Sequence, residues 1–367
     1  MNIKKNKKVI IAMSGGVDSS VSAWILKKRQ YQVEGLFMKN WEEDDLEGYC
    51  NSAQDLFDAE QVCQKLDICL HKINFSLEYW EYVFKNFLNE YQKGKTPNPD
   101  ILCNKEIKFN MFLKYSIQEL KADYIATGHY ARIKKINGKY LLLKGIDRNK
   151  DQSYFLYTLN SIQLKKILFP IGYLEKNQVR NIAKKIDLKI AEKKDSTGIC
   201  FIGPKKIKNF LSLYLPEKKG DIVTIFGQVI GKHNGIFHYT LGQRKGLGIG
   251  GIKGRYNIPW YVVEKNIEKN TLIVAQGSYN QHLMSIGLIA KNINWINNKL
   301  SFPLSCMAKT RYRQKDVACK IESLNNRYIK ILFDSPVIAV TPGQSVVFYL
   351  SETCIGGGII QSRLPLL

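Results

Sequence analysis

The feature that most constrains the fold lies at the start of the chain, where a short apolar run opens into a glycine-rich turn. Residues 8–13 have the sequence KVIIAM, which is typical of a buried strand, and residues 14–20 are SGGVDSS. A helix with apolar residues around Val21 and Ile25 follows, and the next strand is expected over 31–38. This βαβ unit would point free N–H groups and the positive end of a helix at one spot. The turn favours a phosphate ligand, although an ordinary tight turn has the same local pattern.

The alternation of helices and strands continues beyond this unit. Helices are expected over 55–66, 77–92, 103–120 and 176–186, with strands near 69–73 and 124–127. Such alternation predicts an α/β domain with a parallel sheet. From Gly220 onward the segments are short, β-rich and punctuated by glycine, which indicates small β domains. We therefore expect a catalytic domain at 1–208, a small β-rich central domain at 209–280 and a C-terminal β-barrel-like domain at 281–367.

Composition sets the cellular context. The 367 residues are 45% hydrophobic and 24% charged, and no run approaches the ~20 apolar residues of a membrane span. The basic N-terminus precedes an apolar run that is too short for a signal peptide. A cytoplasmic protein with no membrane partner is expected. Eight cysteines are too few for a disulfide scaffold and should be free thiols in a reducing compartment.

The formal net charge of +23 favours a polyanionic partner such as RNA, because Lys and Arg displace the counterions of a phosphate backbone. A second explanation stays open. The chain is rich in Lys, Asn and Ile throughout, as a compositionally biased genome would produce. Charge alone does not decide between the two.

The opening turn lacks the GxxxxGK[ST] pattern of a Walker NTPase. The sequence SGGVDS instead resembles the pyrophosphate-binding loop of the N-type ATP pyrophosphatases, which split ATP between its α and β phosphates and adenylate a substrate oxygen. This resemblance implies a Rossmann-like domain of the adenine nucleotide alpha hydrolase type, with ATP and its accompanying Mg²⁺ as cofactors. It implies Asp18 as a magnesium contact and Met38 as a neighbour of the adenine. The implied ATP-binding residues are Ala12, Met13, Ser14, Gly15, Gly16, Val17, Asp18, Ser19, Met38 and Gly128.

Further motifs resemble those of the bacterial tRNA 2-thiouridylase family, in order and over nearly the whole chain. Ala12 and Leu241 are mild variants beside motif residues. The resemblance implies that the chain adenylates C2 of a wobble uridine in tRNA and replaces the oxygen with sulfur. The matching segments are TPNPDILCN at 96–104, ATGHYAR at 126–132, KDQSYFL at 150–156, DSTGICFIG at 195–203, HYTLGQRKGLGIGG at 238–251, KTRYR at 309–313 and TPGQ at 341–344.

Two cysteines carry the chemistry that this resemblance implies. Cys103 is the implied nucleophile, and Cys200 is the implied carrier of a persulfide received from a sulfur-donor protein. Residues 98–100 have the pattern of a helix start, which would place Cys103 in the first turn near free N–H groups and Lys105, where a thiolate is favoured. Glycines on both sides of Cys200 would permit a mobile loop. The persulfide either attacks C2 directly or releases sulfide when Cys103 forms a disulfide with Cys200, and both routes stay open.

The other six cysteines carry no motif, and we expect inert packing or plain surface positions for them. There is no C-x-x-C pair, so neither a zinc site nor an iron–sulfur cluster is expected. These six residues are Cys50, Cys63, Cys69, Cys306, Cys319 and Cys354.

The resemblance also implies the tRNA contacts. Cations bind phosphates, and Tyr or Arg planes stack on splayed bases, so the implied residue types suit an anticodon loop. Asp100 is in addition the candidate proton acceptor. The glycine run at 246–251 is not a dinucleotide site, because it lies among short strands and lacks a following helix. The implied contacts are Asn98, Pro99 and Asp100 to the target base, and His129, Lys150, Asp151, Gln152, Arg311, Tyr312 and Gln344 to the rest of the tRNA.

Two alternatives remain at this level. Another adenylating enzyme of the same loop family, such as an amide-forming synthetase, would not need paired cysteines. A non-catalytic RNA-binding protein that retains a nucleotide pocket would release no pyrophosphate.

Overall fold

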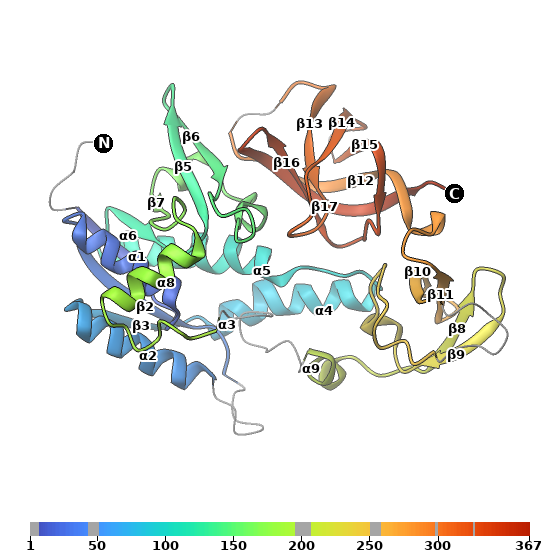
Figure 1. Cartoon of the computed structure of the whole chain (residues 1–367), viewed down its shortest axis with the longest axis horizontal. Helices are drawn as coiled ribbons and strands as arrows, with labels where there is room; N and C mark the ends of the chain where they lie inside the picture. Colours follow the sequence, from blue (N-terminus) through green and yellow to red (C-terminus); the bar gives the residue numbers. More distant parts are fainter. Residues whose placement is uncertain (1–6, 43–50, 195–206, 250–257, 298–299, 326) are drawn as a thin grey trace.

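The computed structural model of the chain describes residues 7–42, 51–194, 207–249, 258–297, 300–325 and 327–367. Figure 1 shows three parts: a sheet flanked by helices in blue and green, a small sheet in yellow and orange, and a barrel in orange and red. The predicted α/β fold class with two β-rich parts is confirmed.

The N-terminal sheet is parallel throughout, with the strand order β3-β2-β1-β4-β7. Its central strand is the apolar run at the start of the chain, and Val9, Ile10 and Ile11 are fully buried. Ile10 belongs to the hydrophobic core on one side of the sheet, whereas Val9 and Ile11 belong to the core on the other. The strands are β1 (Lys8–Ala12), β2 (Gln32–Lys39), β3 (Leu70–Asn74), β4 (Tyr124–Ala126) and β7 (Ile167–Leu168).

The predicted helices of this part are present, but two are not regular. The short helices Ser161–Leu164 and Ile207–Tyr214 were not expected. Each of the stretches predicted over 77–92 and 103–120 contains a π-helical segment, η2 (Trp80–Phe84) and η3 (Cys103–Met111). Hydrophobic periodicity does not distinguish an α-helix from a π-helical segment inside it, so the sequence could not show this. The α-helices are α1 (Val17–Lys28), α2 (Asn51–Leu66), α3 (Ser76–Tyr79), α4 (Lys85–Gln92), α5 (Pro99–Leu102), α6 (Phe112–Gln118), α7 (Ser161–Leu164), α8 (Lys176–Lys185) and α9 (Ile207–Tyr214).

The C-terminal part is a barrel closed by pairing between β12 and β17. Its strand order is β12-β15-β14-β13-β16-β17, and its interior is filled by buried apolar side chains such as Leu288, Ile331 and Phe348. The strands are β12 (Met284–Trp295), β13 (Leu304–Lys309), β14 (Val317–Ser323), β15 (Tyr328–Ile338), β16 (Ser345–Leu350) and β17 (Thr353–Pro365).

A hairpin absent from the sequence-based expectations joins the barrel to the N-terminal part. Strands β5 (Ala131–Ile136) and β6 (Lys139–Lys144) flank Asn137 and Gly138, which both have positive φ. β6 pairs with β17, with Cys354 opposite Leu142. The barrel sheet therefore continues into the N-terminal part, and the two parts share one eight-stranded sheet.

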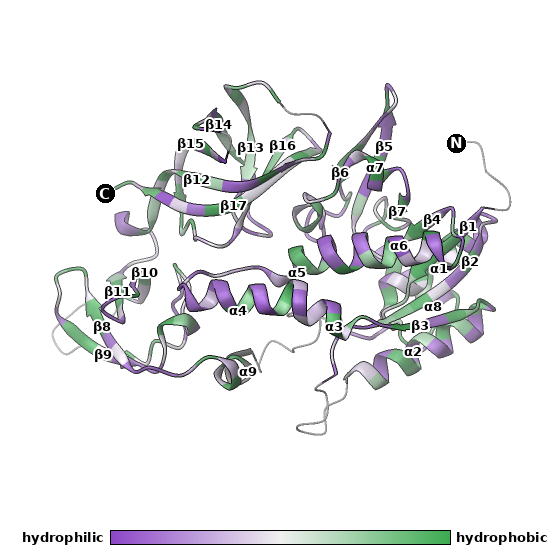
Figure 2. Cartoon of the chain, turned by 180° about the vertical axis from the view of Figure 1, so that it is seen from behind, coloured by the Kyte–Doolittle hydropathy of each residue, from purple (hydrophilic) through white to green (hydrophobic). Residues whose placement is uncertain are grey.

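The central part is a four-stranded sheet of order β10-β11-β8-β9. Figure 1 shows α4 running from the N-terminal sheet toward this small sheet, and Figure 2 shows that hydrophilic and hydrophobic residues alternate along α4. Over the described ranges, no helix is long and apolar enough to cross a membrane. The strands are β8 (Gly220–Thr224), β9 (Val229–His233), β10 (Trp260–Asn266) and β11 (Thr271–Gln276), and single 3₁₀ turns are η4 (Ser153–Leu156), η5 (Ile236–His238) and η6 (Gln281–Leu283).

Candidate active site

The glycine-rich loop lies at the point where the strand order of the parallel sheet reverses. β2 lies on one side of β1 and β4 lies on the other, and Ile11 is paired with Ala126. The segments that leave the carboxyl ends of β1 and β4 therefore border one crevice. In open α/β sheets this crevice is where ligands bind.

The loop is shaped by two glycines. Gly15 has φ +67°, and a Cβ there would lie 2.2 Å from the carbonyl oxygen of Asp55. Gly16 is the N-cap of α1 and has no side chain with which to cap the first turn. The helix start thus leaves room for an anion beside its N–H groups, in agreement with the phosphate ligand predicted from the sequence.

The serines of the loop have different roles. Ser19 is buried, accepts a hydrogen bond from the N–H of Ser14 at 3.3 Å and donates one to the carbonyl of Gly16 at 3.0 Å. Ser14 is exposed at the loop surface. Met13 and Val17 are buried and support the loop from below. Ser19 therefore holds the loop in shape, whereas Ser14 is exposed and its hydroxyl lies 3.2 Å from that of Ser19.

Three other predicted ATP-binding residues flank the loop. A Cβ on Gly128 would lie 2.7 Å from the N atom of Ser19 and 2.8 Å from the carbonyl carbon of Asp18, so only glycine fits this close approach. Met38 is half-buried near the carboxyl end of β2, opposite Ile73. Ala12, also half-buried, is the last residue of β1. All three lie at the edge of the sheet that carries the loop.

The carboxylate of Asp18 is already engaged. Lys176 Nζ lies 2.7 and 2.9 Å from its two oxygens, and the Tyr130 hydroxyl donates to Oδ1 at 2.8 Å. Lys176 and Tyr130 were not predicted, because they are distant in sequence and lie in no phosphate-binding motif. A carboxylate neutralised by a lysine is a poor magnesium ligand, so Asp18 in this arrangement does not fit the predicted metal contact.

A second lysine reaches the loop from the far end of the N-terminal part. Lys193 Nζ donates to the carbonyl of Gly15 at 3.1 Å and forms ion pairs with Asp55 at 2.7 Å and Asp58 at 2.5 Å. Its pKa is raised by these two carboxylates although partial burial acts in the opposite direction. The phosphate loop is thus flanked by two lysines that no sequence motif marks.

The helix start predicted at residues 98–100 is confirmed. Asn98 is the N-cap of α5, its side chain accepts a hydrogen bond from the N–H of Asp100 at 3.1 Å, and Pro99 occupies the first helical position. Cys103, however, lies beyond the first turn, because its N–H bonds to the carbonyl of Pro99. The expected proximity of Cys103 to free N–H groups is therefore wrong.

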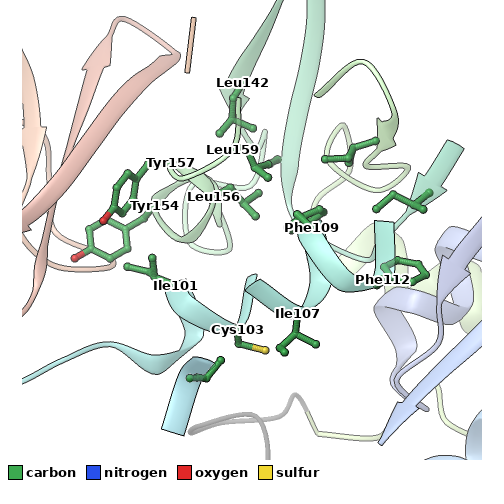
Figure 3. Packing of buried hydrophobic residues seen from close by; sticks show 14 of the residues in the cluster. Ile101, Cys103, Ile107, Phe109, Phe112, Leu142, Tyr154, Leu156, Tyr157 and Leu159 are labelled. Atoms are coloured by element: carbon green, nitrogen blue, oxygen red, sulfur yellow. The ribbon is translucent and has the colours of Figure 1, made fainter. Parts of the chain in front are cut away.

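The surroundings of Cys103 also differ from the prediction. The residue is fully buried at the start of the π-helical segment η3, and Figure 3 shows it on the same side of the helix as Ile107, while Ile101 points toward Tyr154. Lys105 is exposed, and its ammonium is paired with Glu106 at 2.8 Å. π-Helical segments are frequent at functional sites.

His129 is a buried, neutral imidazole. Its Nδ1 lies 2.6 Å from the Thr127 hydroxyl, and its ring packs against both Phe109 and Phe169, with centroids 5.7 and 5.9 Å away. Burial, and secondarily the charge of Lys108, holds the pKa of His129 well below 6.5. In this arrangement the ring is packed in the core and its Nδ1 is occupied. A contact between His129 and RNA would therefore have to use Nε2.

The segment at 127–129 connects the two halves of the site. Gly128 touches the phosphate loop at Ser19, and His129 packs on Phe109 of η3, the segment that begins with Cys103. The glycine-rich loop and the helical segment that begins with Cys103 are therefore fixed relative to one another through three consecutive residues.

Asp151 and Gln152, which were predicted to contact the tRNA, have internal partners. The carboxylate of Asp151 is buried and accepts hydrogen bonds from the N–H groups of Gly145 and Ser153 at 3.0 and 3.1 Å. The Gln152 side chain accepts from the N–H of Tyr130 at 3.0 Å. Asp151 thus acts as an internal acceptor that shapes this turn, not as an exposed RNA contact. Lys150, the third member of the motif, is half-buried beside them.

The remaining predicted tRNA contacts come from the barrel and face the same region. Tyr312 packs on Phe155 with a centroid distance of 4.4 Å, and burial raises its pKa. Arg311 donates to the carbonyl of Leu241 at 2.7 Å and to the Thr341 hydroxyl at 2.8 Å. Gln344 donates to the carbonyl of Thr96 at 2.7 Å. The fold brings these motifs together, although they are far apart in sequence.

Cys200 and Cys50 lie outside the described residues. Of the other motif-free cysteines, Cys63, Cys306, Cys319 and Cys354 are buried and Cys69 is exposed. The described parts of the chain contain no group of three or more His, Cys, Asp or Glu side chains that could hold a metal.

The parallel sheet, the glycine loop at its switch point and the two β-rich parts define a nucleotide-binding protein of the HUP-domain class. Family models match the chain in order: the tRNA methyl transferase HUP domain at residues 7–204, the tRNA methyl transferase PRC-barrel domain at 208–276 and the aminomethyltransferase beta-barrel domain at 285–360. The chain belongs to the tRNA-specific 2-thiouridylase family, as its relatives show.

The relatives match over their full length. The tRNA-specific 2-thiouridylase MnmA of Buchnera aphidicola subsp. Acyrthosiphon pisum (strain APS) is 84% identical over 368 residues, which cover 100% of both chains. The protein of the same name from Salmonella typhimurium (strain LT2) is 60% identical over 361 residues, 98% of each chain. The predicted family resemblance is confirmed.

Proposed function

We propose that this protein is a tRNA-uridine 2-sulfurtransferase that uses ATP to place sulfur on C2 of a wobble uridine. Its full-length similarity to MnmA proteins supports this activity. The structural observation that carries it is the connection through Gly128 and His129, which holds the phosphate loop and the Cys103 helix together. An enzyme that activates an oxygen with ATP and then attacks the same carbon needs both groups at one site.

In the first step the O2 atom of the uracil attacks the α-phosphorus of ATP. The bond from that phosphorus to the bridging oxygen breaks, and pyrophosphate leaves toward the N-terminus of α1. The proton on N3 is lost, with Asp100 as the candidate acceptor. The N–H groups at the start of α1, beside the loop from Ser14 to Ser19, would stabilise the charge of the leaving pyrophosphate, and Lys176 would offset the charge of Asp18 there.

In the second step sulfur replaces AMP at C2. The terminal sulfur of a Cys200 persulfide attacks C2 and the C2–O bond breaks. The Cys103 thiolate then attacks Sγ of Cys200, the electron pair of the S–S bond passes to the sulfur on C2, and a Cys103–Cys200 disulfide remains. Alternatively Cys103 attacks the persulfide first and releases sulfide, which then displaces AMP. Either route ends with a disulfide that an external dithiol must reduce.

The partners and organisation follow from the same proposal. Lys150, Gln152, Arg311, Tyr312 and Gln344 would contact the tRNA anticodon region, with His129 at the mouth of the site. A persulfide-donor protein would load Cys200, and the enzyme would act in the cytoplasm. We place the domain boundaries near residues 208 and 280, and the ends of the matching family models support this division.

The proposal is tested by incubating the protein with ATP, Mg²⁺, a sulfide or persulfide donor and unmodified tRNA. Mass spectrometry of the digested tRNA should show 2-thiouridine, and pyrophosphate should be released in step with it. Absence of 2-thiouridine from every tRNA tried would overturn the proposal.

Two variants separate this function from its alternatives. Cys103→Ser and Cys200→Ser should each abolish 2-thiouridine formation while the protein still binds tRNA and ATP. An amide-forming or other adenylating enzyme would keep its activity without Cys200, and a non-catalytic RNA-binding protein would release no pyrophosphate.

A further inference from the structure

The six residues between α4 and α5 form a junction at which all three parts of the chain meet. This segment, residues 93–98, leads directly into the N-cap of the helix that carries the nucleophile. We name the contacts around Thr96 the Thr96 junction, which consists of Thr96, Thr240, Pro342, Gly343 and Gln344.

The barrel holds the main chain of Thr96 on both sides. The N–H of Thr96 donates to the carbonyl of Pro342 at 3.0 Å, and the side-chain amide of Gln344 donates to the carbonyl of Thr96 at 2.7 Å. Gly343, between them, packs so closely that a Cβ would lie 2.9 Å from the N atom of Thr96. The turn is itself fixed by β17, because Gly343 and Gln344 exchange hydrogen bonds with Ile360 at 2.9 and 2.8 Å.

The central part braces the same segment from another direction. The Thr96 and Thr240 hydroxyls lie 3.4 Å apart. Lys265 donates to the carbonyl of Gly94 at 2.9 Å, and a Cβ on Gly94 would lie 2.2 Å from Ile267. The path of residues 94–96 is thus set by contacts with both β-rich parts.

Thr96 lies two residues before Asn98, the N-cap of α5, and this helix is short and leads into an irregular segment. α5 has four residues before η3 begins at Cys103, so the direction of the entering chain strongly affects where Asn98 and Cys103 lie. A shift of about 1 Å in a reacting group can cost on the order of 10²-fold in rate. A displacement of the Thr96 main chain would therefore displace Cys103 as well.

We propose that the Thr341–Gln344 turn of the barrel positions the nucleophile helix by holding the main chain of Thr96. This inference rests on the proposed thiolation function and deepens it. Gln344 is then a positioning residue in addition to any contact with RNA, because its amide already holds Thr96. The barrel takes part in the chemistry through the main chain that precedes Asn98.

The first test uses a glycine outside the predicted RNA contacts. Gly343→Ala introduces a Cβ 2.9 Å from Thr96 at a residue with φ +92°, and should displace the segment. Gly277→Ala is the matched control, because Gly277 has φ +91° and a Cβ added there would have nothing within 4 Å. The two variants carry the same backbone strain, and only Gly343→Ala disturbs the junction.

The second test removes one hydrogen bond. Gln344→Glu replaces the donor to Thr96 with an acceptor that repels its carbonyl. Gln276→Glu makes the same change where a glutamine amide donates to the carbonyl of Ile258 at 3.2 Å, away from the nucleophile helix. Both junction variants should lower single-turnover thiolation at saturating tRNA at least about tenfold. For Gly343→Ala, the affinity for tRNA should stay within about twofold of the wild-type value. A variant that lost an RNA contact would bind tRNA more weakly than that.

A readout without tRNA keeps the inference separate from the proposed function. Alkylation of each cysteine by iodoacetamide is followed by mass spectrometry in the full-length protein. Buried Cys103 should react at least about tenfold faster in both junction variants than in the wild type or the controls, because a loosened segment opens more often. Exposed Cys69 and buried Cys63 serve as internal references and should not change.

Two results would overturn the inference. Unchanged Cys103 alkylation in Gly343→Ala, with melting temperature and circular dichroism as in the wild type, would show that Thr96 does not position the helix. Equal acceleration of Cys103 and Cys63 would show a general loss of stability instead. A wild-type protein that makes no 2-thiouridine would refute the proposed function and leave the alkylation result standing.

Discussion

Lys176 Nζ lies 2.7 and 2.9 Å from the two carboxylate oxygens of Asp18, a residue of the phosphate loop 158 positions earlier in the chain. The lysine side chain is 9% exposed and the aspartate 30%, so water screens the pair only partly. The pair cancels a negative charge at the place where pyrophosphate is expected to leave. Lys176 thereby makes an acidic residue compatible with an anion site.

Replacing Lys176 with methionine should therefore weaken the ATP half-reaction. The Asp18 carboxylate would then repel the phosphates, and we expect pyrophosphate release to fall about 10–100-fold, equivalent to about 1.4–3 kcal/mol. Steady-state measurement of pyrophosphate with saturating tRNA gives the value. The control is Lys184→Met, on the same helix, which breaks an exposed pair with Glu192 and should change the rate less than about twofold. Equal rates of pyrophosphate release for both variants would show that Lys176 does not influence the reaction with ATP.

Gly128 offers a steric test of the same site. Gly128→Ala would place a Cβ 2.7 Å from the N atom of Ser19 and should push the phosphate loop out of shape, raising the Kd for ATP at least about tenfold. Gly231→Ala is the control, since its Cβ would meet only ordinary contacts at 3.6 Å or more. Isothermal titration with a non-hydrolysable ATP analogue measures both. An unchanged Kd in Gly128→Ala would contradict this close approach.

Local sequence could reveal the phosphate loop and the helix start at Asn98, because both depend on residues within a few positions of one another. It could not reveal Lys176 or Lys193, whose partners are 158 and 178 positions away. The error about the first turn is local, because Cys103 lies five residues after the N-cap Asn98 and its N–H already bonds within the helix. The burial of Cys103, in contrast, depends on distant parts of the chain. It is produced by aromatic and aliphatic side chains from η2 and η4 that only the tertiary fold brings together.

The hairpin β5–β6 was predictable in part. The dipeptide Asn137-Gly138 is by itself a strong local signal of a two-residue hairpin turn. Its pairing with β17, more than 200 residues later, has no local signal. The π-helical stretches were not predictable, since their hydrophobic pattern is that of a helix.

The low pKa of His129 predicts its behaviour in acid. Burial keeps the imidazole neutral in the folded protein, so NMR signals of the His129 ring should not shift between about pH 8 and 5.5. Below pH 6.5 the unfolded chain binds a proton that the folded chain does not, so this residue lowers stability as the pH falls. With five histidines in the chain, His129→Gln assigns the signal. A titration midpoint near 6.5 would contradict a buried neutral ring.

The buried ammonium group of Lys265 should make the stability of the protein depend on pH in the alkaline range. Burial lowers its pKa from 10.5 to about 8. Between about pH 8 and 10.5 the folded protein releases a proton that the unfolded chain retains, so wild-type stability should rise relative to Lys265→Met across this range. The relative gain should reach about 3 kcal/mol at most. Urea unfolding of both proteins at several pH values measures it, and a constant difference would mean that the ammonium is well solvated.

The sheet shared by the hairpin β5–β6 and the barrel also limits where this chain can be divided. Cutting it near residue 280 would strip β6 of its pairing with β17 and leave a bare strand edge. Such edges recruit other chains and promote aggregation. A catalytic fragment expressed alone would be expected to precipitate. Although three family models match successive segments of the chain, these segments are therefore not independent units for expression. Domain swaps between relatives would have to carry the hairpin together with the barrel.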